Sequence, residues 1–225
     1  MGHSRFLWTA DLRDSRMSGK ITALKYQKKN PERVSVYLDG KFALGLPAIV
    51  AARLSPGQFL SDADIEALAE DGAVESFYNQ ALNFLSYRPR SQAEVMTYLL
   101  RRGATESQAE AIVNRLLRAG LLDDEAFAQF WIENREQFRP RSPRALRYEL
   151  RNKGLGNETI ERALASVDVW ASAYRAASKK AGQLQHLDHS TFQRKLVDYL
   201  ARRGFDYEAA RETARRYWVE QRGDE

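Results

Sequence analysis

The feature that most constrains this chain is a helical motif that occurs three times, at a spacing of about 50 residues. Each copy begins at Ser or Thr, carries two apolar residues four positions apart, and ends in Lys-Gly or Arg-Gly. Ser and Thr are favoured helix N-caps, the apolar pair marks one helix face, and Gly readily adopts the left-handed conformation that follows a helix. The copies run from Arg88-Pro89-Arg90-Ser91 through Val95 and Leu99 to Arg102-Gly103, from Arg139-Pro140-Arg141-Ser142 through Leu146 and Leu150 to Lys153-Gly154, and from Ser190-Thr191-Phe192 through Leu196 and Leu200 to Arg203-Gly204.

Each motif helix is flanked by two further helical patterns, so the repeating unit is predicted to contain three helices. Units this short cannot bury their apolar faces alone, and neighbouring units must share a core. We therefore expect a mainly α fold in which three tandem three-helix repeats form an elongated array. The repeats are predicted at 73–122, 123–167 and 168–225, with first helices at 74–86, 124–137 and 169–182 and last helices at 106–119, 157–166 and 207–220.

The region before the repeats has a different pattern, and we interpret residues 21–72 as a small β-rich domain with short helices after a tail at 1–20. Alternating apolar residues flank Asp39-Gly40, which is a strong β-hairpin signal. A third strand is predicted from Ile21 to Tyr26, then a loop at 28–31, a short helix at 47–54 and a helix that begins at Ser61. This domain either caps one end of the array or offers a secondary contact surface through Lys25, Lys28, Lys29 and Arg33.

Composition and motifs argue against catalysis. The chain has no cysteine, no glycine-rich phosphate loop and no apolar run long enough to span a bilayer. The adjacent carboxylates Asp123-Asp124 fit a helix N-cap, and His186, Asp188 and His189 could hold a metal only with a further ligand. We therefore expect a non-enzymatic cytoplasmic protein without metal, cofactor or membrane contact.

Positive charge is concentrated in one segment. Residues 135–153 carry seven basic residues against two acidic ones, or +5, which equals the net charge of the whole chain. Arginine pairs equally well with phosphates and carboxylates, so these side chains indicate binding without specifying the partner. Two structural roles are the alternatives to binding. The basic side chains could form a solvated helix face, or, at the Lys/Arg-Gly ends, interact favourably with the helix dipole. The candidate binding residues are Arg139, Arg141, Arg144, Arg147, Arg151 and Lys153, with Arg101, Arg102, Arg202 and Arg203 at the other two helix ends.

Taken together, these residues resemble the bacterial RecX family, whose members regulate the RecA recombinase. The resemblance covers residues 73–225 and extends to Arg33-Val34-Ser35-Val36-Tyr37-Leu38-Asp39-Gly40 near the N-terminus. Its most specific part is the stretch from Leu121-Leu122-Asp123-Asp124-Glu125-Ala126-Phe127-Ala128 to Leu150-Arg151-Asn152-Lys153-Gly154. Further matches are Ser91-Gln92-Ala93-Glu94, Leu99-Leu100-Arg101-Arg102-Gly103 and Arg202-Arg203-Gly204-Phe205.

The resemblance implies a protein that binds RecA and its filament on single-stranded DNA, and that modulates recombinase and coprotease activity, with inhibition as the expected effect. Nothing in the repeats demands a dimer, so we expect a monomer. Weak, salt-sensitive contact with DNA is expected beside it. The alternative is a direct DNA-binding protein of helical-repeat type that acts without RecA.

Overall fold

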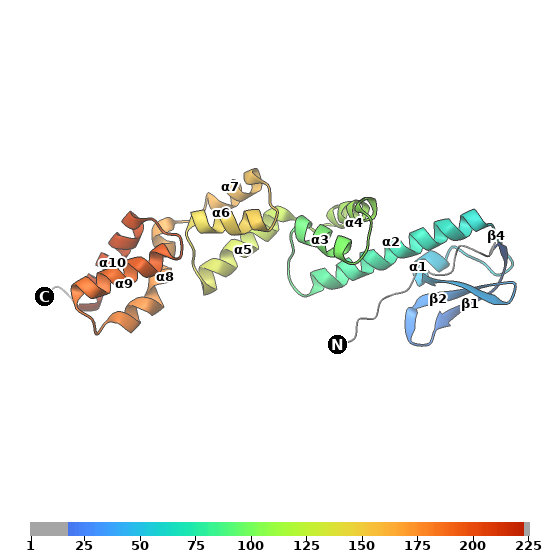
Figure 1. Cartoon of the computed structure of the whole chain (residues 1–225), viewed down its shortest axis with the longest axis horizontal. Coiled ribbons are helices and arrows are strands. Elements are labelled where there is room, and N and C mark those ends of the chain that lie inside the picture. Colours follow the sequence, from blue (N-terminus) through green and yellow to red (C-terminus); the bar gives the residue numbers. More distant parts are fainter. Residues whose placement is uncertain (1–17, 223–225) are drawn as a thin grey trace. The chain divides into compact units, whose positions relative to one another are not determined.

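The computed structural model describes residues 18–222, with side chains to 220, and divides after Leu82 into two compact units. Figure 1 shows the order of the strands and helices. The fold is mainly helical, with strands confined to the N-terminal unit, as predicted. The predicted tail at 1–20 lies outside the described residues up to position 17.

The N-terminal unit contains one antiparallel sheet with the strand order β3-β2-β1-β4. The predicted hairpin at Asp39-Gly40 is confirmed, because the two residues join β2 to β3 with φ of 47° and 84°. The predicted third strand is confirmed as β1. The predicted loop at 28–31 is shorter than expected, because β2 begins at Asn30, which pairs with Gln27 of β1. The strands are β1 (Gly19–Gln27), β2 (Asn30–Leu38), β3 (Lys41–Pro47) and β4 (Phe59–Leu60).

Two helices complete this unit, and both differ from the prediction. The helix expected at 47–54 is only the single turn α1 (Ala48–Ala51). The helix expected at Ser61 does begin there, since Ser61 and Asp64 exchange capping hydrogen bonds of 3.2 and 2.8 Å. It does not stop before a separate helix at 74–86, however, because α2 (Asp62–Ser86) is continuous and crosses the predicted segment limit at 72/73.

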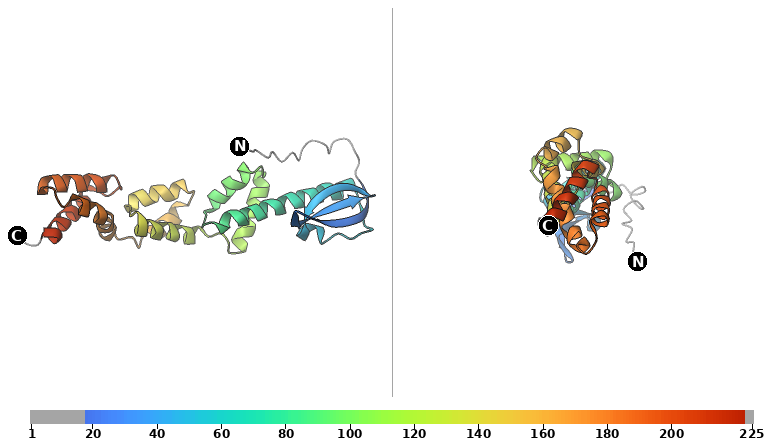
Figure 2. Two further views of the ribbon diagram at one scale, coloured as in Figure 1. Left: turned by 90° about the horizontal axis from the view of Figure 1, so that it is seen from below. Right: turned by 90° about the vertical axis from the view of Figure 1, so that its left-hand side faces the viewer.

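Gly72 explains why α2 can continue along the sheet, an arrangement that Figure 2 shows from below. Glycine weakens a helix interior by about 1 kcal/mol relative to alanine. At this position, however, a Cβ atom would lie 2.9 Å from the Leu46 side chain. The missing side chain lets α2 lie close to β3, and Ile65 in its first turn is buried in the same core as Leu46.

The second unit contains the three-helix repeats, which confirms the central prediction. Among the residues that the structure describes, the core that neighbouring units were expected to share is not found between the second and third repeats, because each of them buries its own apolar cluster and the two meet through hydrogen bonds. Predicted and observed helix ends agree within a few residues for the second and third repeats. The helices after α2 are α3 (Gln92–Arg101), α4 (Glu106–Arg118), α5 (Asp124–Phe138), α6 (Pro143–Asn152), α7 (Asn157–Leu164), α8 (Val169–Leu184), α9 (His189–Ala201) and α10 (Tyr207–Arg222).

The caps of the motif helices follow the prediction in two copies of three. Ser91 accepts a hydrogen bond from the N–H of Glu94 in α3, and Ser142 accepts one from the N–H of Ala145 in α6. In the third copy the predicted Ser190-Thr191 cap is wrong, because the Asp188 carboxylate caps α9 instead. A carboxylate is an equally good N-cap acceptor, so the helix simply begins earlier.

The first and second repeats meet where the end of α6 contacts the beginning of α3. The Ser91 hydroxyl, which is fully buried, donates to the carbonyl oxygen of Lys153 over 2.6 Å. Gly154 follows with φ of +81°, and a Cβ atom there would lie 2.2 Å from the Cβ of Ala93. The Ser91 side chain thus caps α3 and also donates a hydrogen bond to a carbonyl group at the end of α6, where carbonyl groups have no partner within their own helix.

The second and third repeats meet in the same manner, at the end of α9 and the beginning of α6. The N–H of Ser142 donates to the Arg203 carbonyl over 3.2 Å, and the Arg203 guanidinium donates to the carbonyl of Pro140 over 3.1 Å. A Cβ atom at Gly204 would lie 2.6 Å from the Ser142 hydroxyl oxygen. In both junctions the negative end of one helix dipole meets the positive end of another, which is favourable.

The glycines of the motif permit a matched test of these junctions. Gly103 and Gly154 both have positive φ, but nothing lies within 4 Å of a Cβ atom placed on Gly103. Gly103→Ala should therefore cost only backbone strain, about 1 kcal/mol. Gly154→Ala should cost roughly 1–3 kcal/mol more, because it also forces the repeats apart. Urea unfolding of the full chain measures both, and equal losses would contradict the junction geometry.

Candidate partner interface in the middle repeat

Helix α6 separates an apolar face from a basic one. Leu146 and Leu150 are fully buried with Phe127 of α5, while Arg144 and Arg151 are exposed on the other side. The i, i+7 spacing places these two arginines on one face, roughly 10 Å apart along the helix. The predicted arginine stripe opposite the leucines therefore exists, but its members differ in how far their charge is free.

Glu149 neutralises part of the positive charge that was predicted for this segment. Its Oε2 accepts hydrogen bonds from the Trp131 indole N–H at 2.9 Å and from the Arg135 Nε at 2.7 Å. Its Oε1 lies 3.7 Å from the Nε of Arg141, whose side chain is 24% exposed. Glu149 therefore joins α6 to α5, and it also compensates part of the charge of Arg141 inside the repeat.

Arg147 is also paired. Its Nε and a terminal nitrogen donate to the two carboxylate oxygens of Glu161 in α7 over 2.6 and 2.7 Å, a two-pronged geometry that arginine favours. The hydrogen bond from Arg147 lowers the pKa of Glu161, so this carboxylate stays ionised. Arg147 thus joins α6 to α7, although it lies on the predicted binding stripe.

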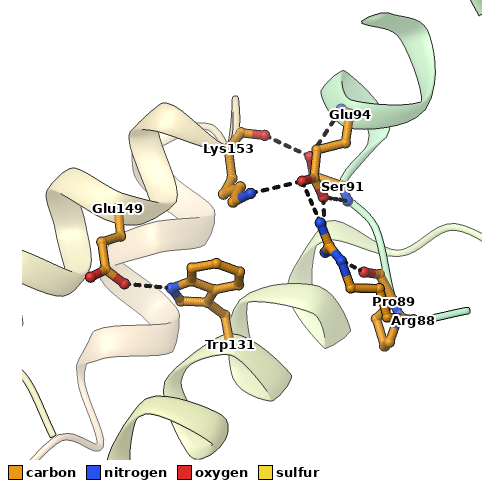
Figure 3. Close-up of polar contacts among 7 residues, drawn as sticks. All are labelled: Arg88, Pro89, Ser91, Glu94, Trp131, Glu149 and Lys153. Atoms are coloured by element: carbon orange, nitrogen blue, oxygen red, sulfur yellow. Dashed lines mark hydrogen bonds and ion pairs between the residues drawn. The ribbon is translucent and has the colours of Figure 1, made fainter. Parts of the chain in front are cut away.

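Lys153 lies in the junction with the first repeat, which Figure 3 shows in detail. Its Nζ donates to Glu94 over 2.8 Å, and Arg88 donates to the same carboxylate over 3.0 Å. Burial raises the pKa of Glu94, but the hydrogen bonds from Lys153 and Arg88 outweigh it and hold the pKa below its ordinary value. The Nζ also lies 4.9 Å from the centre of the Trp131 ring.

Three arginines of the segment form no ion pair with a carboxylate of the described residues, although the charge of Arg151 acts on Glu161 at longer range. Arg139, which ends α5, and Arg144 are exposed and make no side-chain hydrogen bond or ion pair with the residues that the structure describes. Arg151 donates only to the neutral amide oxygen of Asn157, over 3.1 Å. The net charge of +5 counted along the segment therefore overstates what a partner meets, because four of its seven basic residues face a carboxylate.

Comparison with known proteins assigns the whole series of segments to one family. Four family models match in order: Regulatory protein RecX N-terminal domain at 19–60, and the first, second and third RecX three-helix domains at 78–116, 123–164 and 166–213. The chain belongs to the RecX family of regulatory proteins. Membership implies a regulatory role in recombination, and the repeats are the three-helix domains of that family.

Individual RecX proteins agree with this assignment. Regulatory protein RecX of Listeria monocytogenes is 30% identical over 87% of this chain and 74% of its own length. That of Bacillus subtilis is 31% identical over 84% of this chain and 73% of its own. A crystal structure of regulatory protein RecX matches with a TM-score of 0.69 and 27% identity, over 84% of this chain and 96% of the other.

A second crystal structure, of RecX from Lactobacillus salivarius, supports the fold. It matches with a TM-score of 0.57 and 24% identity over 65% of this chain and 97% of the other. Within residues 18–222, no helix is long and apolar enough to cross a membrane. No group of three or more His, Asp or Glu side chains among these residues could hold a metal ion.

The remaining predicted residues lie on several elements of the fold. Arg203 lies in the second junction, while Arg102 is exposed and lies 5.2 Å from the Tyr98 ring. Arg101 and Arg202 are exposed. In the N-terminal unit, Lys25 lies over the Tyr37 ring, Lys28 and Lys29 form the exposed β1–β2 turn, and Arg33 donates to the carbonyl oxygen of Gly45.

Sequence reasoning did not identify the acidic partners. Glu94, Glu149 and Glu161 come from three different helices, and each pairs with a basic residue of the predicted site. Glu94 had a usable signal, since it stands at the capping-box position after Ser91. The other two are ordinary exposed-face glutamates in the sequence, and only the packing of α5, α6 and α7 brings them to their arginines.

Lys153 and Arg144 provide a test of structural against binding charge. In Lys153→Met the apolar stem remains over Trp131 while the ion pair is lost, so the free energy of unfolding should fall by about 1–3 kcal/mol. In Arg144→Met the loss should stay below about 0.5 kcal/mol, because no internal contact is removed. Chemical denaturation measures both, and a stable Lys153→Met variant would refute the junction role.

Proposed function

We propose that this RecX protein binds RecA and the RecA filament on single-stranded DNA, and inhibits recombinase and coprotease activity in the cytoplasm without catalysing a reaction. The observation that carries the proposal is the unbroken series of four RecX family models along the chain. The relatives that match most of the chain are named regulatory proteins, which fits action by binding.

The middle repeat supplies the best surface for that contact. Arg139, Arg144 and Arg151 are exposed and form no ion pair among the described residues, so a partner can contact them without breaking one. A filament presents the same subunit surface many times over, and several weak contacts from a chain of repeats add as avidity. The junctions matter for this, because their hydrogen bonds join successive repeats.

Direct binding of DNA is the second candidate function, and the exposed arginines alone support it. Arginine's planar donors suit phosphate as well as carboxylate. The number of free arginines argues against a purely electrostatic site, since tight non-specific binding requires many neutralised phosphates. We therefore place contact with RecA first and contact with DNA second.

Salt dependence separates the two candidates. Binding to bare single-stranded DNA should be weak, with a log–log salt slope near −0.7 per phosphate contacted, or about −2 for three arginines. Binding to a RecA–DNA filament should be at least about tenfold tighter at physiological salt and less sensitive to it. Fluorescence anisotropy with labelled RecX measures both, and equal affinity for DNA and filament would reject the RecA role.

The three free arginines permit a matched mutational test. The triple variant Arg139→Ala, Arg144→Ala, Arg151→Ala should bind the filament about tenfold or more weakly, since each charge contributes roughly 0.5–1 kcal/mol at an exposed interface. Its helical circular-dichroism signal should be unchanged. The control removes three exposed basic residues of the third repeat, Arg194, Lys195 and Arg211. Equal weakening by the control would mean that only net charge matters.

A further inference from the structure

An open groove of about 530 Å³ lies where the first repeat meets the second. One wall is the segment between α2 and α3, and the other is formed by the α4–α5 connection and the first half of α5. It does not include the free arginines of α6. The lining includes three large apolar residues, two arginines and one carboxylate, which are Tyr87, Leu121, Phe130, Arg88, Arg90 and Asp123.

The walls of this groove expose large apolar side chains. The side chain of Tyr87 is 83% exposed, that of Leu121 49% and that of Phe130 38%. Single exposed apolar residues are ordinary on a protein surface. Three that line one groove are less so, because grouped exposed apolar surface marks sites of interaction.

Arg90 adds an unsatisfied cation to these walls. Its guanidinium lies 3.9 Å from the centre of the Phe84 ring, its Nε is buried without a hydrogen bond, and it has no ion pair among the described residues. Burial and the like charge of Arg88 lower the pKa of Arg90, and the charge of Glu94 offsets only part of this effect. Arg88 itself is paired with Glu94. Because Arg90 lines the groove and has no direct ion pair, its guanidinium charge can be met by a carboxylate in the groove.

The second copy of the motif shows what the first copy lacks. Arg141 is the counterpart of Arg90, and its Nε also has no hydrogen bond, but the carboxylate of Glu149 lies 3.7 Å away. The position equivalent to Glu149 in the first copy is Tyr98, whose ring stacks on Phe84. In the first copy the nearby Glu94 carboxylate pairs directly with Arg88 and Lys153 and acts on Arg90 only at longer range. Arg90 therefore lies at an open groove without a carboxylate in direct contact.

We infer that this groove binds a segment of a protein partner, which inserts a large apolar side chain between Tyr87, Leu121 and Phe130 and places a carboxylate beside Arg90. The exposed apolar walls suit an apolar side chain, which a protein segment offers and a phosphate backbone does not. The Asp123 carboxylate on the lining caps α5 through the N–H groups of Glu125 and Ala126. The inference rests on the proposed function, which makes the chain a binder of other proteins, and it adds a second contact surface to the arginines of α6.

The test uses the full chain and two labelled probe peptides. The acidic probe contains Leu and Phe flanked by Glu, and the basic probe replaces every Glu with Lys. Fluorescence anisotropy should show saturable binding of the acidic probe, at least about tenfold tighter than that of the basic probe. The same titrations are run in competition with an unlabelled oligothymidine.

Three variants locate the binding. Tyr87→Asp combined with Leu121→Asp should weaken the acidic probe by about tenfold or more, because it places charge in the apolar walls. Arg90→Leu keeps the contact with Phe84 and should bind the two probes about equally. Tyr207→Asp changes another exposed tyrosine, 70% exposed on α10, and should leave binding unchanged.

Each outcome decides the inference separately from the proposed function. Absence of saturable binding of the acidic probe, or equal weakening by Tyr207→Asp, overturns the groove even if the chain binds the RecA filament. Displacement of the probe by oligothymidine, with the same variants losing the oligothymidine, makes the groove a nucleic-acid site and also overturns it. Probe binding that follows the pattern above, in a chain that does not bind RecA, supports the groove and rejects the proposed function alone.

Discussion

The arrangement of the second unit depends on one contact, in which the last carbonyl groups of a motif helix meet the capped beginning of the motif helix one repeat earlier. Both partners bring unsatisfied backbone groups and opposite dipole ends, so the contact removes two costs at once. Gly154 and Gly204 allow the chains to approach, and buried Ser91 and Ser142 satisfy the polar groups that the approach encloses. The same parts, used twice, give the repeats a defined relation to one another.

This contact changes the meaning of the basic residues. A Lys/Arg-Gly helix end looks like a binding feature when charges are counted along the chain, yet Lys153 and Arg203 use their side chains within the junctions. Their charge helps to hold the repeats together, while exposed Arg144 remains for a partner. The motif of a repeat protein must both join neighbouring repeats and contact a partner, and here different residues of the motif serve these two roles.

The copies of the motif have diverged in the neighbourhood of their shared arginine. Glu149 lies beside Arg141 in the second copy, whereas in the first Arg90 lies over Phe84, on which Tyr98 stacks. A common scaffold therefore presents a closed, self-paired surface in one repeat and an open, apolar groove in another. Divergence of this kind lets a tandem array offer different contacts along its length.

The sequence alone determined the repeats, the hairpin and the family, because helical periodicity, serine caps, Asp39-Gly40 and the motif itself are local patterns. The sequence misplaced the cap of α9, because Asp188 is as good an N-cap as Ser190. It also divided α2, because glycine usually weakens a helix, whereas Gly72 lies inside α2 where a side chain would meet Leu46 of β3. Tertiary structure alone decided which charges are free. The glutamate partners of Arg147 and Lys153 lie on other helices, and no local pattern records which helices pack together.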